Sequence, residues 1–262
     1  MRLRLAVLLI STMVLAPAWA AVRGQEAEYR AGDTVMKGYL AYDDAASGKR
    51  AGVLVVHEWW GLNEHARDIA RRLAQAGYVA LAPDMYGGGR STEHPEDAGQ
   101  MAAQLRKNHD LAMRRFRAAR DFLAGWPQVD GSRIAAFGYC FGGTVVLEAA
   151  RSGADLRGVV SFHGGLGTER RARPGDIEAE ILVLNGADDP FVPPDQVRAF
   201  EQEMRAAGAR YRVINYPGAV HSFTNPAATA LGRKFDMPLE YNAEADHKSW
   251  AEAQAFLRRV LR

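Results

Sequence analysis

The sequence of 262 residues contains a single cysteine, Cys140. One thiol cannot form a disulfide within the chain, which excludes a disulfide-stapled scaffold. Neither sign of charge is in excess, because 33 lysines and arginines accompany 31 aspartates and glutamates, so nothing points to a nucleic-acid partner. Low-complexity runs, short repeats and Pro/Gly-rich linkers are also missing, which indicates one domain.

The N-terminus differs in kind from the rest of the chain. Arg2 and Arg4 precede the nearly uninterrupted apolar run Leu5–Leu15, and Ala18 and Ala20 follow it. This order predicts a secretory signal peptide over residues 1–20, followed by a domain over residues 21–262. The apolar run is shorter than the roughly 20 residues of a membrane anchor. We therefore expect a protein exported to the periplasm or secreted, with no membrane association after cleavage.

Short apolar runs alternate with longer amphipathic segments along the chain, which predicts a mostly parallel sheet between two layers of helices. The expected strands are 35–42, 52–57, 78–82, 133–137, 158–162, 180–184 and 211–216. The expected helices are 64–76, 96–124, 142–151, 195–207 and 246–261.

Cys140 lies between a predicted strand and a predicted helix, in the sequence Gly138-Tyr139-Cys140-Phe141-Gly142. Glycine two residues to either side is typical of a nucleophile elbow, where the turn is too tight for side chains at those positions. A helix N-terminus also favours a thiolate. The alternative is a buried structural cysteine. The pattern favours a catalytic nucleophile.

A thiol nucleophile needs a base, and candidates follow the later strands. The strand 180–184 leads to two adjacent carboxylates, Asp188 and Asp189, and the strand 211–216 leads to His221. The order nucleophile, acid, histidine is that of a hydrolase triad. We predict the triad Cys140, Asp189 and His221, with Asp188 as the second candidate for the acid.

The loop after the first buried strand reads His57-Glu58-Trp59-Trp60. In an elbow-type site this loop supplies one oxyanion-hole amide, and the residue after the nucleophile supplies the other. We therefore predict the N–H groups of Trp59 and Phe141 as oxyanion donors. Glu58 is expected at the mouth of the site, although a simply solvated glutamate is equally common.

A metal site is not expected. His57, His65 and Glu58 are close in sequence, but a buried strand that ends in a loop does not direct them at one ion. His57 ends a predicted strand and His163 follows one, which indicates structural histidines. No cofactor is expected either.

On these residues the chain resembles the dienelactone hydrolase family, over nearly the whole predicted domain. The segments that carry the resemblance are Gly-Tyr-Cys-Phe-Gly-Gly, Val-His-Glu-Trp-Trp-Gly-Leu, Ala-Pro-Asp-Met-Tyr-Gly and His-Ser-Phe. The resemblance implies a three-layer α/β-hydrolase fold with a mostly parallel sheet. It also implies that Glu58 contacts the thiol and holds it quiescent, and that Tyr86 and Ser222 line the substrate pocket.

The sequence departs from the family pattern in one loop. A substrate-gripping arginine of the family is replaced by Gly87–Gly89, and the next arginine is Arg90. Arg90 is the candidate substrate ligand in its place. The predicted signal peptide also separates the protein from the compartment where dienelactones are formed, so the natural substrate stays open.

We therefore expect a monomeric, cofactor-independent hydrolase of a small ester or lactone that acts through an acyl-thioester. Two alternatives are open from the sequence. One is a non-catalytic module that binds a ligand or responds to oxidation of its thiol. The other is an acyltransferase that uses the same triad.

Overall fold

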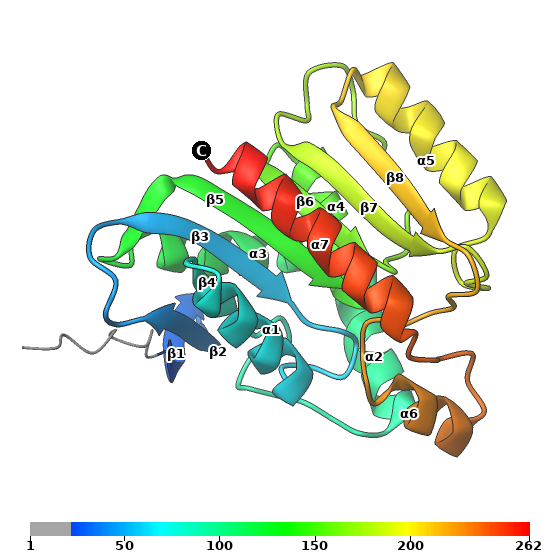
Figure 1. Cartoon of the computed structure of the whole chain (residues 1–262), viewed down its shortest axis with the longest axis horizontal. Coiled ribbons are helices and arrows are strands. Elements are labelled where there is room, and N and C mark those ends of the chain that lie inside the picture. Colours follow the sequence, from blue (N-terminus) through cyan, green and yellow to red (C-terminus); the bar gives the residue numbers. More distant parts are fainter. Residues whose placement is uncertain (1–21) are drawn as a thin grey trace, which may run out of the picture.

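A computed structural model describes residues 22–262, and these residues form an eight-stranded sheet in the order β1-β2-β4-β3-β5-β6-β7-β8 (Figure 1). The predicted signal peptide, residues 1–20, lies outside the described residues. The strands are β1 (Val22–Ala31), β2 (Thr34–Asp43), β3 (Arg50–Val56), β4 (Val79–Ala82), β5 (Val129–Tyr139), β6 (Gly158–Phe162), β7 (Glu180–Gly186) and β8 (Tyr211–Tyr216).

The sheet is mostly parallel, as predicted. β2 pairs antiparallel with both β1 and β4, and every other neighbouring pair is parallel. The central strands are continuous apolar runs, because helices cover both of their faces. The carboxyl ends of β3, β5, β6, β7 and β8 therefore meet at one edge, where loops from distant parts of the sequence come together.

Helices cover both faces of this sheet (Figure 1). They are α1 (Glu64–Gln75), α2 (Pro95–Lys107), α3 (His109–Ala124), α4 (Phe141–Arg151), α5 (Pro194–Ala207), α6 (Ala228–Phe235) and α7 (Ala243–Val260). Side chains of α1 and α7, including Leu73 and Phe256, pack in one apolar core. Side chains of α3, α4 and α5, including Phe116, Val146 and Phe200, pack in the other. The three-layer α/β architecture is thus the one predicted.

Three elements differ from the sequence-based expectation. The helix expected over 96–124 is two helices, because the backbone of Asn108 leaves the helical region with φ −125° and ψ 77°. β1 was not expected, since its polar residues face solvent on an outer strand and only Ala27, Tyr29 and Ala31 are buried. The short helix α6 was also not expected.

The connection between β6 and β7 is unusual for a parallel crossover, which is commonly helical. Residues 163–179, all of them described, contain neither a helix nor a strand. One flank of α4 is consequently covered by an irregular loop. Among the helices of residues 22–262, none has the length and apolar content needed to cross a bilayer.

Asn108 starts α3, because its Oδ1 accepts a hydrogen bond from the Leu111 amide at 3.0 Å. We expect Asn108→Ala to lower the free energy of unfolding by about 1 kcal/mol, the usual cost of losing such a cap. Asn108→Asp keeps the acceptor and is the matched control, expected close to wild type. Urea denaturation of the three proteins measures the difference, and equal stability of both variants would contradict the assignment.

Candidate active site

The predicted nucleophile lies at a strained point of the backbone. Cys140 separates β5 from α4 and has φ 53° and ψ −114°, a region that residues with a side chain rarely adopt. The residue is partly exposed, at the edge where the parallel strands end. This geometry presents the thiol at the N-terminus of α4.

The glycines around Cys140 are required by close backbone packing. A Cβ on Gly138 would stand 2.1 Å from the carbonyl oxygen of Gly142. A Cβ on Gly142 would stand 2.2 Å from the carbonyl oxygen of Val56, at the end of β3. The elbow therefore brings α4 directly against the neighbouring strand, which no residue with a side chain allows at these positions.

The predicted acid and base are in contact. Nδ1 of His221 lies 2.8 Å from Oδ2 of Asp189, and both residues are buried. The other carboxylate oxygen of Asp189 accepts the amide of Phe191 at 2.8 Å, which fixes the carboxylate. Asp188 is exposed and accepts the amide of Gly218 instead, so of the two candidates Asp189 is the one that contacts His221.

His221 also interacts with Cys140. Burial by itself lowers the pKa of His221, but the charge of Cys140 and the hydrogen bond with Asp189 raise it to about 10. Because Nδ1 is engaged by Asp189, Nε2 is the nitrogen left for the sulfur. The imidazole thus links the carboxylate of Asp189 to Cys140.

Glu58 is buried in the same cluster and has two hydrogen-bond donors. Its Oε1 accepts the Ser222 hydroxyl at 2.8 Å, and its Oε2 accepts the Asn225 amide group at 2.6 Å. The family resemblance implied a contact with the thiol, whereas in this structure the carboxylate is bonded to the loop after His221. Asn225 was not among the predicted site residues, since nothing in its local sequence indicates a partner 167 positions away.

The two predicted oxyanion donors flank the elbow. Phe141 is the first residue of α4, where an amide has no acceptor within the helix. Trp59 lies in the loop after β3, and its carbonyl accepts the Tyr86 hydroxyl at 2.8 Å. Tyr86 is buried, and its hydroxyl holds this loop. Burial raises the pKa of Tyr86, and the charge of Cys140 raises it further, so the hydroxyl stays protonated.

Arg90 bonds the backbone of the loop to which it belongs. Its guanidinium is exposed and donates to the carbonyls of Tyr86 and Gly87, at 2.5 and 3.3 Å. The glycine loop around it is held by Asp84, whose carboxylate accepts the amides of Lys37, Tyr86, Gly87 and Gly89. The role of Arg90 in this structure is therefore to close its own loop.

Two further histidines, His57 and His163, form hydrogen bonds with the loops that carry the site residues. His57 donates from Nδ1 to the Glu58 carbonyl at 2.5 Å and accepts the Met85 amide at Nε2. His163 accepts the amide of Cys140 at Nδ1 and bonds Thr224 through Nε2. Burial lowers the pKa of both rings, so they act as neutral connectors.

Within residues 22–262, no group of three or more histidine, cysteine, aspartate or glutamate side chains is arranged to hold a metal ion.

We expect the pKa of His221 to fall in Cys140→Ala, because the interaction with Cys140 is the largest of the effects that raise it. A long-range ¹H–¹⁵N NMR titration of the imidazole measures the pKa, and Asp188→Asn is the control that leaves it unchanged. The raised pKa stabilises the fold fully below the ordinary value of 6.5, and this stabilisation is lost as pH rises through about 10. Unfolding of wild type should therefore depend more steeply on alkaline pH than unfolding of Cys140→Ala. Identical titrations would contradict the pairing.

Comparison with known proteins identifies the family of the chain. A sequence model of the dienelactone hydrolase family matches residues 36–261. A candidate carboxymethylenebutenolidase of Escherichia coli (strain K12) is 32% identical over 227 residues, which are 82% of each chain. Among solved structures, the dienelactone hydrolase-like promiscuous phosphotriesterase P91 from metagenomic libraries is 37% identical with a TM-score of 0.84, over 92% of this chain and all of that one (100%). The structure of m3DLH is 39% identical with a TM-score of 0.86, over the same shares of 92% and 100%. The chain therefore belongs to the dienelactone hydrolase family, with the α/β-hydrolase fold.

Proposed function

We propose that this hydrolase-family protein cleaves carboxylic esters or lactones with Cys140 as nucleophile, His221 as acid and base, and Asp189 as the residue that orients His221. The observation that carries the proposal is the buried 2.8 Å contact between Asp189 and His221, beside a thiol displayed by a glycine-flanked elbow. Nucleophile, base and orienting acid in contact are the minimum that covalent acyl transfer requires. Neither the acylation of the thiol nor the hydrolysis of the resulting thioester needs a cofactor.

In the first step the Cys140 thiolate attacks the carbonyl carbon, and the carbonyl electrons move onto oxygen. The amides of Trp59 and Phe141 stabilise this oxyanion. As the oxyanion collapses, the C–O bond to the leaving group breaks, and His221 gives its proton to the leaving oxygen. The acyl group is then held on Cys140 as a thioester.

In the second step His221 takes a proton from water, and the resulting hydroxide attacks the thioester. The C–S bond breaks, and the thiolate and imidazolium pair is restored. Asp189 keeps Nδ1 of His221 protonated throughout, so that Nε2 handles both proton transfers.

Glu58 is the residue that the resemblance assigns to holding the thiol quiescent. A carboxylate beside the nucleophile would compete for the proton of the thiol, but Ser222 and Asn225 bond both of its oxygens. These two bonds hold the carboxylate in a fixed position. The contact between Glu58 and the thiol implied by the resemblance would require breaking them.

A second candidate activity is hydrolysis of phosphotriesters. The solved relative at 37% identity is a phosphotriesterase that spans this chain almost completely. Attack of the same thiolate at phosphorus would use the same oxyanion donors. Paraoxon, assayed beside a p-nitrophenyl ester, tests this candidate.

Two further expectations complete the proposal. The N-terminal segment supports export to the periplasm or the exterior, and we propose that the mature protein acts there as a monomer on a small molecule. Acyl transfer to an acceptor other than water uses the same first step. A rate that rises with added alcohol or amine, with the acylated acceptor as product, would indicate transfer.

Cys140→Ala is expected to abolish turnover of p-nitrophenyl acetate while the protein keeps its circular dichroism spectrum. Asp189→Asn is expected to lower kcat by about a thousandfold or more, because the amide no longer orients and stabilises the imidazolium. Asp188→Asn is the matched control, since this neighbouring carboxylate is exposed and bonds only its own loop. Undiminished turnover in Cys140→Ala would contradict the proposal and favour a non-catalytic role for the thiol.

A further inference from the structure

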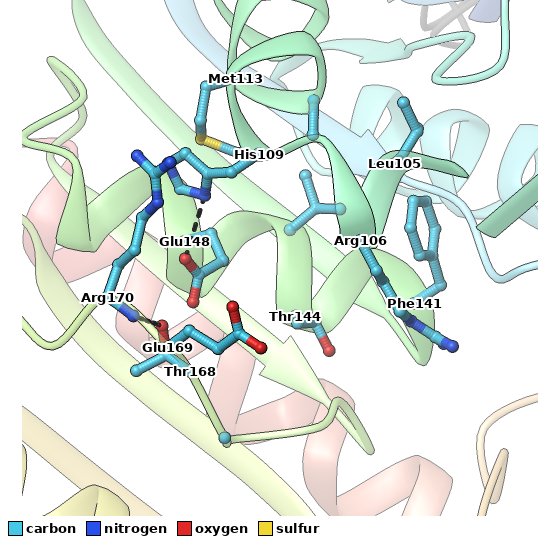
Figure 2. A pocket seen from close by; sticks show the side chains of 13 residues that line it. Leu105, Arg106, His109, Met113, Phe141, Thr144, Glu148, Thr168, Glu169 and Arg170 are labelled. Carbon is cyan, nitrogen blue, oxygen red and sulfur yellow. Dashed lines mark hydrogen bonds and ion pairs between the residues drawn. The ribbon is translucent and has the colours of Figure 1, made fainter. Parts of the chain in front are cut away.

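A groove of about 410 Å³ runs along α4, beside the elbow (Figure 2). Its floor is apolar and consists of Leu105, Ala112, Met113, Phe141 and Val145. The walls come from the junction of α2 with α3 on one side and from the loop 167–170 on the other. The volume is in the range of pockets that hold small organic ligands.

The groove exists because the connection from β6 to β7 lacks a helix. The start of this connection is tied to α4, since the Thr144 hydroxyl donates to the Gly165 carbonyl at 3.0 Å and Arg151 donates to the Leu166 carbonyl at 2.9 Å. Beyond these ties, Gly167, Glu169 and Arg170 are exposed. The flank of α4 that a crossover helix would cover is left open.

One end of the groove is lined by a residue of the elbow. Phe141 follows Cys140 directly, and Phe141, Thr144, Val145 and Glu148 are spaced so that they share one face of α4. At a rise of about 1.5 Å per residue, Thr144 lies about 6 Å and Glu148 about 12 Å along the helix axis from Cys140. The groove therefore leads away from the thiol over the length of a medium-sized chain.

Most charged side chains that line the groove already have partners. Glu148 lies 2.9 Å from Arg151, which also pairs with Glu203 at 2.8 Å, and 3.3 Å from His109. Arg170 lies 3.5 Å from Asp110. Arg106 and Glu169, one charge of each sign, are exposed at the rim. An uncharged apolar occupant fits this combination of an apolar floor with neutralised walls.

The position of His221 indicates which part of an ester would enter. His221 must protonate the leaving oxygen, so the leaving group lies on the side of the loop after β8. The residues that line the groove belong to α2, α3, α4 and the loop 167–170, and none of them belongs to the loop after β8. The arm of the substrate directed toward the groove is thus the acyl arm.

We propose that the groove is the acyl-binding site of this enzyme and that it selects esters with an elongated, uncharged acyl chain. The proposal rests on the proposed function, because it assumes acylation of Cys140. Each methylene that leaves water on binding raises kcat/KM by up to about fourfold. The preference for longer chains should end where the groove ends.

Gly167 allows a direct test. A Cβ at this position meets no atom within 4 Å, and its φ lies outside the left-handed region, so a larger side chain costs the fold little. Gly167→Trp fills the groove, and Gly167→Ala is the matched control that leaves it open.

p-Nitrophenyl esters from acetate to decanoate are assayed on wild type and both variants. We expect kcat/KM of wild type and Gly167→Ala to rise with chain length. Gly167→Trp should keep kcat/KM for the acetate ester within about twofold of wild type. Its kcat/KM for the octanoate ester should fall at least about tenfold, which is less than the effect of exposing two buried methylenes.

Thr168→Trp fills the same groove from the next residue and should repeat the result if Gly167→Trp proves unstable. Equal effects of Gly167→Trp on acetate and octanoate, or no effect on either, would overturn the proposal. Acetate esters of longer alcohols are assayed as well. If Gly167→Trp lowered kcat/KM only for these esters, the proposal would also be overturned, because the groove would then hold the leaving group. Failure of the proposed function looks different, since wild type would turn over no ester faster than Cys140→Ala.

Discussion

The close backbone packing at the elbow is the constraint on which the rest of the site depends. Gly142 lies so near the carbonyl of Val56 that α4 rests directly on the end of β3, and Cys140 takes a strained conformation in consequence. Strain of this kind persists only where surrounding structure enforces it. Here the sheet enforces it, because β3, β5 and β6 pair in register up to the elbow.

That constraint places the nucleophile where the other loops converge. β7 and β8 end at the same edge, so Asp189 and His221 meet although they are 32 positions apart. Glu58 joins two of these loops, since it leaves β3 and bonds Ser222 and Asn225 beyond β8. His163 joins the elbow amide to Thr224 in the same way. The loop with the base is thus tied to the nucleophile by buried polar contacts, whose loss would be costly.

The sequence predicts the parts of this arrangement that follow from local pattern. Apolar runs marked the strands, glycine spacing marked the elbow, and strand order put Asp189 and His221 after it. The sequence did not predict the role of Asn225, because that role depends on Glu58, which is distant in the sequence. It did not predict the break at Asn108 either, because the residues on both sides of Asn108 favour helix and the break depends on Asn108 capping the second helix. Arg90 was predicted to bind the substrate, which no contact in the structure tests; its guanidinium bonds the backbone of its own loop, and the carboxylate of Asp84 holds that loop through the amides of Gly87 and Gly89.

Substrate choice must then come from parts of the structure that the chemistry leaves free. Tyr86, His57 and Glu58 are buried and committed to backbone or loop contacts, so changes there would disturb the oxyanion loop before they altered selectivity. In the connection from β6 to β7, His163 and the ties to α4 come before residue 167, and Gly167, Glu169 and Arg170 are exposed. Because this connection forms one wall of the groove beside Phe141, a longer or helical connection would close the groove and leave the elbow intact. On the proposal that the groove binds the acyl chain, chain-length selectivity would thus depend on this connection and not on Cys140, Asp189 or His221.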